Sequence, residues 1–557
     1  MANVPQLQRN IEIALGKQKA DLVLKNATVV DLFCHTTHVC DVAIADGIIV
    51  GLGQYDGNLL VDCTGKFVMP SFFDTHLHFE SSLATPDRYL SVAVPHGVTT
   101  INADCHEIAN VCGETGVQYM MDCVKNIPVN VRFMLSSCVP STPFDHANAE
   151  FTAADTERMM AEGKYCGLAE MMNYPAVLAG DTEVLRKIAC AAHTDGHAPA
   201  LSGKQLNAYL AAGISTDHEC NTVPEVLEKV GKGMYVQIRE GSQTKNLTTL
   251  IGAVNNATKR RLLFCSDDRD IGDVRATGTI QNCVVTAVEK GVDIFDALTI
   301  ASLNAYECYG IPRCGAIAIG YCADLLVTDN LVPRKILQVY CNGKKVAENG
   351  KALFGLSSAD ASLVTNTVHI SPLNEKDFIP KFTAGQTPVM EVFPNTIVTA
   401  RTYCSSTKGL NLCAVIERHK ASGNVGCCYV KGFDLKGGAI AQTVGHDAHN
   451  ITVVGDNPHD MLLAVDALGK NGGMAIVAKG KVECVFELPI AGLMSAKEPD
   501  EIIAEHETLF EKTKACLQMN PDISPYMLLS FLSLVVVPEL KLTDSGLFDV
   551  TNFRFID

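Results

Sequence analysis

Two histidines, His76 and His78, stand two positions apart in the segment 72–78, directly after a short apolar stretch. Side chains two residues apart on a β-strand point to the same face of the sheet, so both imidazoles can enter one site. Paired imidazoles are suitable ligands for a divalent transition metal. The pair alone is a weak signal, because histidines are common in strands, and its weight depends on what the other strand ends carry.

Four more candidate metal ligands end the fourth, fifth, sixth and eighth of eight predicted strands: Glu170, His197, His218 and Asp267. Together with the first pair they supply four histidines, one aspartate and a glutamate that can bridge. This set of side chains predicts a site for two divalent metal ions.

The elements that position these residues form a repeating pattern. Apolar segments of four to eight residues end in polar residues, and helical stretches follow them. The predicted strand ends are residues 74–76, 101–104, 135–137, 168–170, 195–197, 216–218, 238–240 and 265–267. Eight strands that alternate with helices predict a (β/α)₈ barrel, whose chemistry takes place at the carboxyl ends of its strands.

The barrel is flanked by other units. Short strand-like segments lie at 21–25, 27–31, 41–45 and 47–50, and similar strand-like segments lie in a later block at 323–346. Asp46-Gly47 and Asn342-Gly343 are typical of tight hairpin turns. We therefore expect one small β-sandwich domain built from both sides of the barrel segment.

An additional α/β domain is expected at the end of the chain, with strands at 395–400, 451–454 and 474–478. The predicted division is 1–69 and 314–362 for the small β domain, 70–313 for the catalytic barrel and 363–557 for the C-terminal domain.

Composition limits the class of protein. The 557 residues are 47% hydrophobic and 19% charged, which excludes a disordered chain. The 62 acidic residues outnumber the 45 Lys and Arg, giving a net charge of −17 that disfavours nucleic acid and anionic membranes as partners. None of the 22 cysteines forms a Cys-x-x-Cys pair, and no apolar run is long enough for a signal peptide or a membrane span. We expect reduced thiols in a cytoplasmic protein.

Ten motifs spread through most of the chain make it similar to one family. They are residues 72–82, 95–100, 103–111, 196–199, 201–203, 217–220, 238–242, 264–269, 445–451 and 488–495. The chain resembles the amidohydrolase superfamily and, within it, the bacterial adenine deaminases. The segment His-Glu-Ile-Ala-Asn at 106–110 and the last two motifs distinguish this family from relatives similar to dihydroorotase or urease.

The resemblance implies a hydrolase that converts adenine to hypoxanthine and ammonia in purine salvage. In that family a carboxylate bridges the two metals, which fits Glu170. By residue-by-residue transfer, His76, His78 and Asp267 would hold one metal with Glu170, and His197 and His218 would hold the other. Manganese or iron is the usual metal in such sites, and zinc is an alternative.

The resemblance also implies the catalytic and substrate-binding groups. Asp267 would take a proton from the attacking water and pass it toward ammonia. Glu219 and Glu107 are both candidates for the acid that protonates the purine ring. The candidate substrate-binding residues are Glu80, Ser81, His106, Ser202 and Arg239. Glu80 and Ser81 could instead shape a loop, and Arg239 could instead form an internal ion pair with acidic neighbours.

A second cluster, His446, Asp447 and His449, lies in the C-terminal domain. It lacks a fixed geometry and an evident fourth ligand, so we expect a loop cap or a domain contact rather than a metal site.

Three alternatives to adenine deamination stay open. One is a deaminase of N6-substituted adenine, such as N6-methyladenine. Another is a cyclic amide hydrolase, although a lysine is the usual bridge there. The third is a barrel that has lost its metals and serves as a scaffold, against which six retained ligands argue. The resemblance further implies a homodimer or a larger homo-oligomer that acts on a free purine base.

Overall fold

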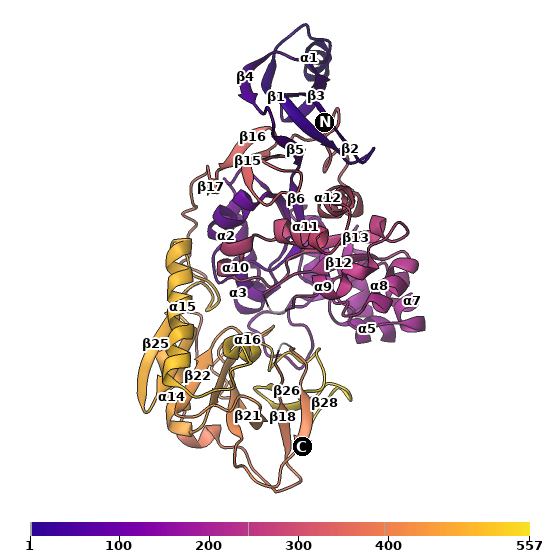
Figure 1. Ribbon diagram of the computed structural model, residues 1–557. Helices are drawn as coiled ribbons and strands as arrows, with labels where there is room; N and C mark the ends of the chain where they lie inside the picture. Colours follow the sequence, from indigo (N-terminus) through magenta and orange to yellow (C-terminus); the bar gives the residue numbers. More distant parts are fainter. Residues whose placement is uncertain (1–2, 243, 395, 557) are drawn as a thin grey trace.

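The computed structural model describes residues 3–242, 244–394 and 396–556. Figure 1 shows a small β domain at one end of the molecule, a barrel in the middle and a C-terminal domain at the opposite end. Among the described residues, no helix is both long enough and apolar enough to cross a membrane.

The barrel has the eight predicted parallel strands. They are β6 (Phe72–Leu77), β7 (Val98–Asp104), β8 (Asn130–Met134), β9 (Leu168–Met171), β10 (Thr194–Gly196), β11 (Thr216–Asp217), β12 (Tyr235–Arg239) and β13 (Leu262–Cys265). A parallel bridge from Leu77 to Asp267 closes the ring between the last strand and the first. Three strands stop one or two residues before the predicted ligands His197, His218 and Asp267, because the chain leaves the ladder there to form the loops of the site.

Helices surround the barrel in sequence with these strands. They are α2 (Pro86–Ala93), α3 (His106–Val124), α4 (Ala153–Ala161), α5 (Tyr174–Ala179), α6 (Thr182–Ala189), α7 (Gly203–Ala211), α8 (Val223–Gly231), α9 (Leu247–Leu250), α10 (Ile271–Thr277), α11 (Ile280–Glu289), α12 (Ile294–Ala301) and α13 (Leu303–Cys308). The barrel interior and the inner faces of many of these helices share one large core of buried apolar side chains.

Strands from both sides of the barrel form one sheet in the small domain. They are β1 (Ala20–Asp31), β2 (Thr36–Ala45), β3 (Ile48–Gly53), β4 (Gly57–Asp62), β5 (Phe67–Pro70), β14 (Leu325–Thr328), β15 (Ile336–Cys341), β16 (Lys344–Glu348) and β17 (Lys351–Ala352). The antiparallel pairing of β5 with β14 joins the two halves. Alternate residues of β1 and β2 enter separate apolar clusters, and helix α1 (Val4–Ala14) contributes Ile13 to one of them.

The predicted strands at 21–25 and 27–31 are one strand, β1. A register shift between Leu24 and Ala27, where Asn26 has a positive φ of 56°, interrupts the pattern without ending the strand. Such an extra residue is a β-bulge, which a sequence pattern cannot distinguish from a break.

The C-terminal domain is built on an eight-stranded sheet in the order β19-β18-β21-β20-β23-β22-β24-β25. These strands are β18 (Pro388–Glu391), β19 (Ala400–Tyr403), β20 (Asn411–Ile416), β21 (Val425–Lys431), β22 (Gly438–Gln442), β23 (Ile451–Gly455), β24 (Gly473–Ala478) and β25 (Lys481–Glu487). The other elements are α14 (Pro458–Ala467), α15 (Pro499–Cys516), α16 (Pro525–Ser530), β26 (Leu540–Thr543), β27 (Gly546–Asp549) and β28 (Arg554–Phe555).

Two of the three strands predicted in this domain, at 451–454 and 474–478, are confirmed by β23 and β24. The prediction at 395–400 was wrong for its described part, since β19 begins only at Ala400, and residue 395 lies outside the described residues. The preceding Thr399 donates its backbone N–H to Pro538 and its hydroxyl to Leu540, so this segment attaches the C-terminal strands instead.

The C-terminal domain packs against the barrel loop that follows β6. Ser495 donates its N–H to the carbonyl of Leu83 at 2.8 Å, and Thr85 donates to the carbonyl of Ser495 at 3.1 Å. In Figure 1 this domain, drawn in orange to yellow, lies on the side of the barrel away from the small domain. The carboxyl ends of the barrel strands therefore face a second domain rather than open solvent.

The two hairpin turns predicted at Asp46-Gly47 and Asn342-Gly343 are confirmed and lie against each other. All four residues have positive φ, from 49° to 75°. A Cβ added to Gly47 would lie 2.9 Å from the carbonyl oxygen of Asn342, whereas one added to Gly65, with a φ of 70°, would meet nothing within 4 Å.

We expect Gly47→Ala to destabilise the protein more than Gly65→Ala. Both variants place a side chain in left-handed backbone, at a cost of about 1–2 kcal/mol. Only Gly47→Ala also forces the two turns apart, which adds about 1–3 kcal/mol. Urea unfolding followed by circular dichroism compares the two, and equal midpoints would contradict a tight contact between the turns.

Candidate metal centre

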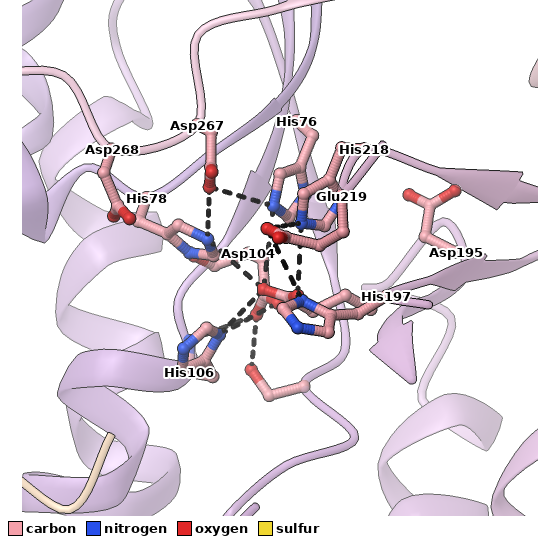
Figure 2. A network of polar contacts seen from close by, with 12 residues as sticks. His76, His78, Asp104, His106, Asp195, His197, His218, Glu219, Asp267 and Asp268 are labelled. Atoms are coloured by element: carbon pink, nitrogen blue, oxygen red, sulfur yellow. Dashed lines mark hydrogen bonds and ion pairs between the residues drawn. The ribbon is translucent and has the colours of Figure 1, made fainter. Parts of the chain in front are cut away.

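The first predicted histidine pair meets two carboxylates at the end of β6. The Nε2 atom of His78 lies 3.3 Å from Oε1 of Glu170 and 3.2 Å from Oδ1 of Asp267. The Nε2 atom of His76 lies 3.6 Å and 3.4 Å from the same two oxygens. All four side chains are buried, and Figure 2 shows His76, His78 and Asp267 close together within one network of polar contacts.

The second pair approaches the other oxygen of Glu170. The Nδ1 atom of His197 lies 2.7 Å from Oε2, and the Nε2 atom of His218 lies 3.4 Å from it. One carboxylate therefore has a histidine pair on each of its oxygens. This is the arrangement expected of a ligand that bridges two cations.

The ring atoms of these histidines fit metal ligation. His78 donates from Nδ1 to the backbone carbonyl of Asp104 at 3.0 Å, which leaves the lone pair of Nε2 directed at the carboxylates. Within the described part of the chain, Nε2 of His76, the ring nitrogen that faces the two carboxylates, is buried and has no hydrogen-bond partner. Buried polar atoms are rarely left unpaired unless something else occupies them. Imidazoles and carboxylates together are donors that zinc, iron and manganese accept.

His106 lies at this cluster and is oriented by an acid that the sequence analysis did not single out. Its Nδ1 lies 3.0 Å from Oδ2 of Asp104 and 3.7 Å from Oε1 of Glu170. Asp104 also accepts hydrogen bonds from the N–H of His106 and from the hydroxyl of Ser136. Asp104 ends β7, and this position at a strand end was the signal that could have identified it.

Arg239 was expected either to bind substrate or to form an internal ion pair with acidic neighbours. The ion pair is present. The guanidinium lies 2.5 Å from Oδ2 of Asp267 and also pairs with Glu219. Burial alone would raise the pKa of Asp267, but Arg239 and the nearby imidazoles hold that pKa well below its usual range. Asp267 is therefore an ionised carboxylate, with one oxygen facing the histidines and the other facing Arg239.

The remaining predicted substrate residues have different surroundings. Glu80 is buried and accepts the N–H of Ile108 at 3.0 Å, and burial raises its pKa to about 7. Ser81 donates to Asp268 at 2.5 Å. Ser202 is exposed at the start of α7 and does not line the cavity at the cluster, because the chain leaves the barrel mouth after His197. The prediction for Ser202 is not supported by this geometry.

The cluster 446–449 of the C-terminal domain reaches the barrel at Glu107. His446 contacts Oε1 and His449 contacts Oε2 of that carboxylate. Asp447 lies 3.7 Å from Nε2 of His106. The expected domain contact is therefore present, and it reaches into the wall of the site.

A buried lysine holds the two loops that carry His197 and His218. Lys229 on α8 donates to Asp217 at 2.8 Å and to the carbonyl of Ala198 at 2.7 Å. Asp217 in turn accepts the N–H of Ala198 at 2.7 Å. Burial would raise the pKa of Asp217, but Lys229 outweighs it and lowers the pKa to about 2.

Two buried residues hold the loop of the C-terminal domain. Arg418 donates to the carbonyls of His449 and Ala491, and Nε2 of His419 donates to the carbonyl of Ala448 at 2.7 Å. Burial, followed by the nearby charge of Arg418, lowers the pKa of His419 to about 3.

Comparisons with known proteins find relatives that match almost the whole chain. The amidohydrolase family model matches residues 67–346, and the model of the adenine deaminase C-terminal domain matches residues 392–554. A protein named adenine deaminase from Clostridium acetobutylicum is 42% identical over 567 residues, covering 99% of this chain and 100% of the relative. Another of that name from Nitratidesulfovibrio vulgaris is 41% identical, covering 99% and 98%. Among solved structures, a beta-aspartyl dipeptidase from Fervidobacterium islandicum aligns over 60% of this chain and 99% of its own, with a TM-score of 0.47 and 15% identity.

We expect Lys229→Met to destabilise the protein by about 3–5 kcal/mol, because it leaves Asp217 buried without its counter-charge. Lys232→Met, at the residue directly after the same helix, is the matched control. Lys232 is part-exposed and pairs with Glu228, so its loss costs no more than about 1 kcal/mol. Urea unfolding measures both, and equal losses would contradict a structural role for the buried pair.

Stability should fall as the pH drops below the ordinary pKa of histidine. His419 is neutral in the folded state down to about pH 3, whereas in the unfolded chain it gains a proton near pH 6.5. The unfolded state therefore binds more protons over this range. Between pH 7 and pH 5, His419 alone lowers the free energy of unfolding by about 2 kcal/mol.

The His419→Gln variant should lose that part of the pH dependence in urea unfolding. His459→Gln, which changes an exposed imidazole on α14, should keep the wild-type dependence. An unchanged slope in His419→Gln would contradict the buried neutral imidazole.

Proposed function

The chain belongs to the adenine deaminase family and is a hydrolase that deaminates adenine, and we propose that the reaction takes place at the cluster around Glu170. The observation that carries this proposal is the pair of histidines on each oxygen of that one carboxylate. The products are hypoxanthine and ammonia.

The side chains of the cluster divide into two ligand sets. His76, His78 and Asp267 would hold one divalent cation and His197 and His218 the other, with Glu170 shared between them. Manganese, iron or zinc suits these donors. The chemistry that two such cations supply is a water of lowered pKa and stabilisation of the negative charge that develops on the substrate.

Asp267 is placed to move the proton of the attacking water. It is ionised, so it can accept that proton as water adds to C6 of adenine, and it then passes the proton to the departing amino group. Arg239 fixes the carboxylate by holding its second oxygen. The water supplies the oxygen of hypoxanthine, and the broken C6–N bond releases ammonia.

Glu219 is the better candidate for the acid that protonates the purine ring. It lies 3.6 Å from the ring of His218 and lines the cavity at the cluster. Burial would raise the pKa of Glu107, but His446, His449 and His106 hold it well below its usual range, which keeps Glu107 ionised. Both oxygens of Glu107 contact histidines of the C-terminal domain, whereas the contacts of Glu219 with His197, His218 and Arg239 all use Oε1 and leave Oε2 for the substrate.

The activity is tested by ammonia release from adenine, N6-methyladenine and adenosine, given separately to manganese-loaded protein. We expect rapid turnover of adenine and at least 100-fold lower kcat/KM for the other two. Preference for N6-methyladenine would keep the chemistry and change the substrate. No turnover of any of the three with metal bound would contradict the proposal.

Two isosteric variants separate the roles of the glutamates. Glu170→Gln should lose at least one of two bound metals and its turnover, because an amide is a poor bridge between cations. Glu219→Gln should keep both metals while kcat falls about 10²–10⁴-fold, which is the usual contribution of a general acid. Metal analysis of the purified variants checks this, and full metal content in Glu170→Gln would exclude the bridging role.

A further inference from the structure

His446 belongs to the C-terminal domain but stands in the wall of the barrel site. Its loop lies between β22 and β23, and its ring stacks on Phe531 with centroids 4.5 Å apart and planes 7° apart. Its Nδ1 pairs with Glu107 at the start of α3. The ring is therefore held from its face and from one edge, while the edge with Nε2 forms no hydrogen bond with any described residue.

Glu107 is itself fixed by a second histidine. The N–H of Gly445 donates to Nδ1 of His449, so this ring carries its proton on Nε2 and donates it to Glu107. Glu107 thus has one oxygen on each imidazole. Its Oε1 also lies 3.3 Å from Nε2 of His106, so Glu107 connects His446 to the cluster and sets the position of the ring.

His446 also stands where two cavities meet. A narrow cavity of about 40 Å³ is lined by the metal-ligand candidates, and a wider one of about 270 Å³ lies between the barrel loops and the C-terminal domain. Asp268 and His446 line both. The narrow cavity has room for only a few water molecules. A purine whose reacting carbon lies at the cluster can extend into the wider cavity past these two side chains.

We propose that His446 is a substrate-binding residue supplied by the C-terminal domain, and that its Nε2 edge hydrogen-bonds the polar edge of the purine. This inference rests on the proposed function, since it takes the reacting carbon to lie at the cluster. Glu107 and His449 set the orientation of the ring, and Phe531 supports its face. The barrel alone would then lack one wall of its substrate pocket.

The competing interpretation is a contact that only joins the domains through Glu107. The two interpretations use different ring nitrogens, so two amides distinguish them. The amide nitrogen of asparagine can replace Nδ1 and keep the bond to Glu107, but it has no group at the place of Nε2. Glutamine reaches the place of Nε2.

The test measures hypoxanthine binding by calorimetry and kcat/KM for adenine, on the full-length metal-loaded protein. We expect His446→Asn to bind hypoxanthine at least 10-fold more weakly, which matches the loss of one hydrogen bond. His446→Gln should recover most of that affinity. Both variants should keep the wild-type metal content, and His459→Gln should match wild type throughout.

Wild-type affinity in His446→Asn together with weak binding in His446→Gln would overturn the inference and leave a domain contact. A different result would contradict the proposed function, namely that the wild-type protein releases no ammonia from adenine. In that case the hypoxanthine affinities of the two variants still decide whether His446 contacts a purine.

Discussion

The structure depends on the burial of one carboxylate, Glu170, among imidazoles. Burial alone would raise the pKa of this group, but the surrounding histidines hold it well below its usual range, so the carboxylate stays ionised. An ionised group without water is stable only when its partners are fixed in place. The barrel fixes those partners at the ends of three other strands, β6, β10 and β11.

The need to hold the partners of Glu170 in place explains the charged groups around the cluster. Lys229 and Asp217 hold the loops of the second histidine pair, and Arg239 joins Glu219 to Asp267. These charges do not face solvent, and each is paired, so the surrounding charges compensate one another. The C-terminal domain continues the pattern, since its histidines reach Glu107 at the rim of the site. Metal ligation, loop position and domain packing are thus parts of one electrostatic network.

The sequence predicted the eight strands because each apolar segment ends in residues able to do chemistry, and the ligand candidates occupy those ends. It could not predict contacts that join distant positions without a local pattern. His446 and Glu107 are 339 residues apart, and nothing near either one indicates the other. Ser202 shows the opposite case, since a motif suggested a substrate contact while the residue is exposed at the start of α7. Lys229 was missed because a buried lysine on a helix has the same spacing as an exposed one.

The most direct test of the account is anomalous diffraction from crystals of the manganese-loaded protein. The account predicts two manganese peaks with Glu170 between them, one beside His76, His78 and Asp267 and the other beside His197 and His218. A single peak, or a peak held by Asp104 and His106 without Glu170, would contradict the shared carboxylate on which the proposed chemistry depends.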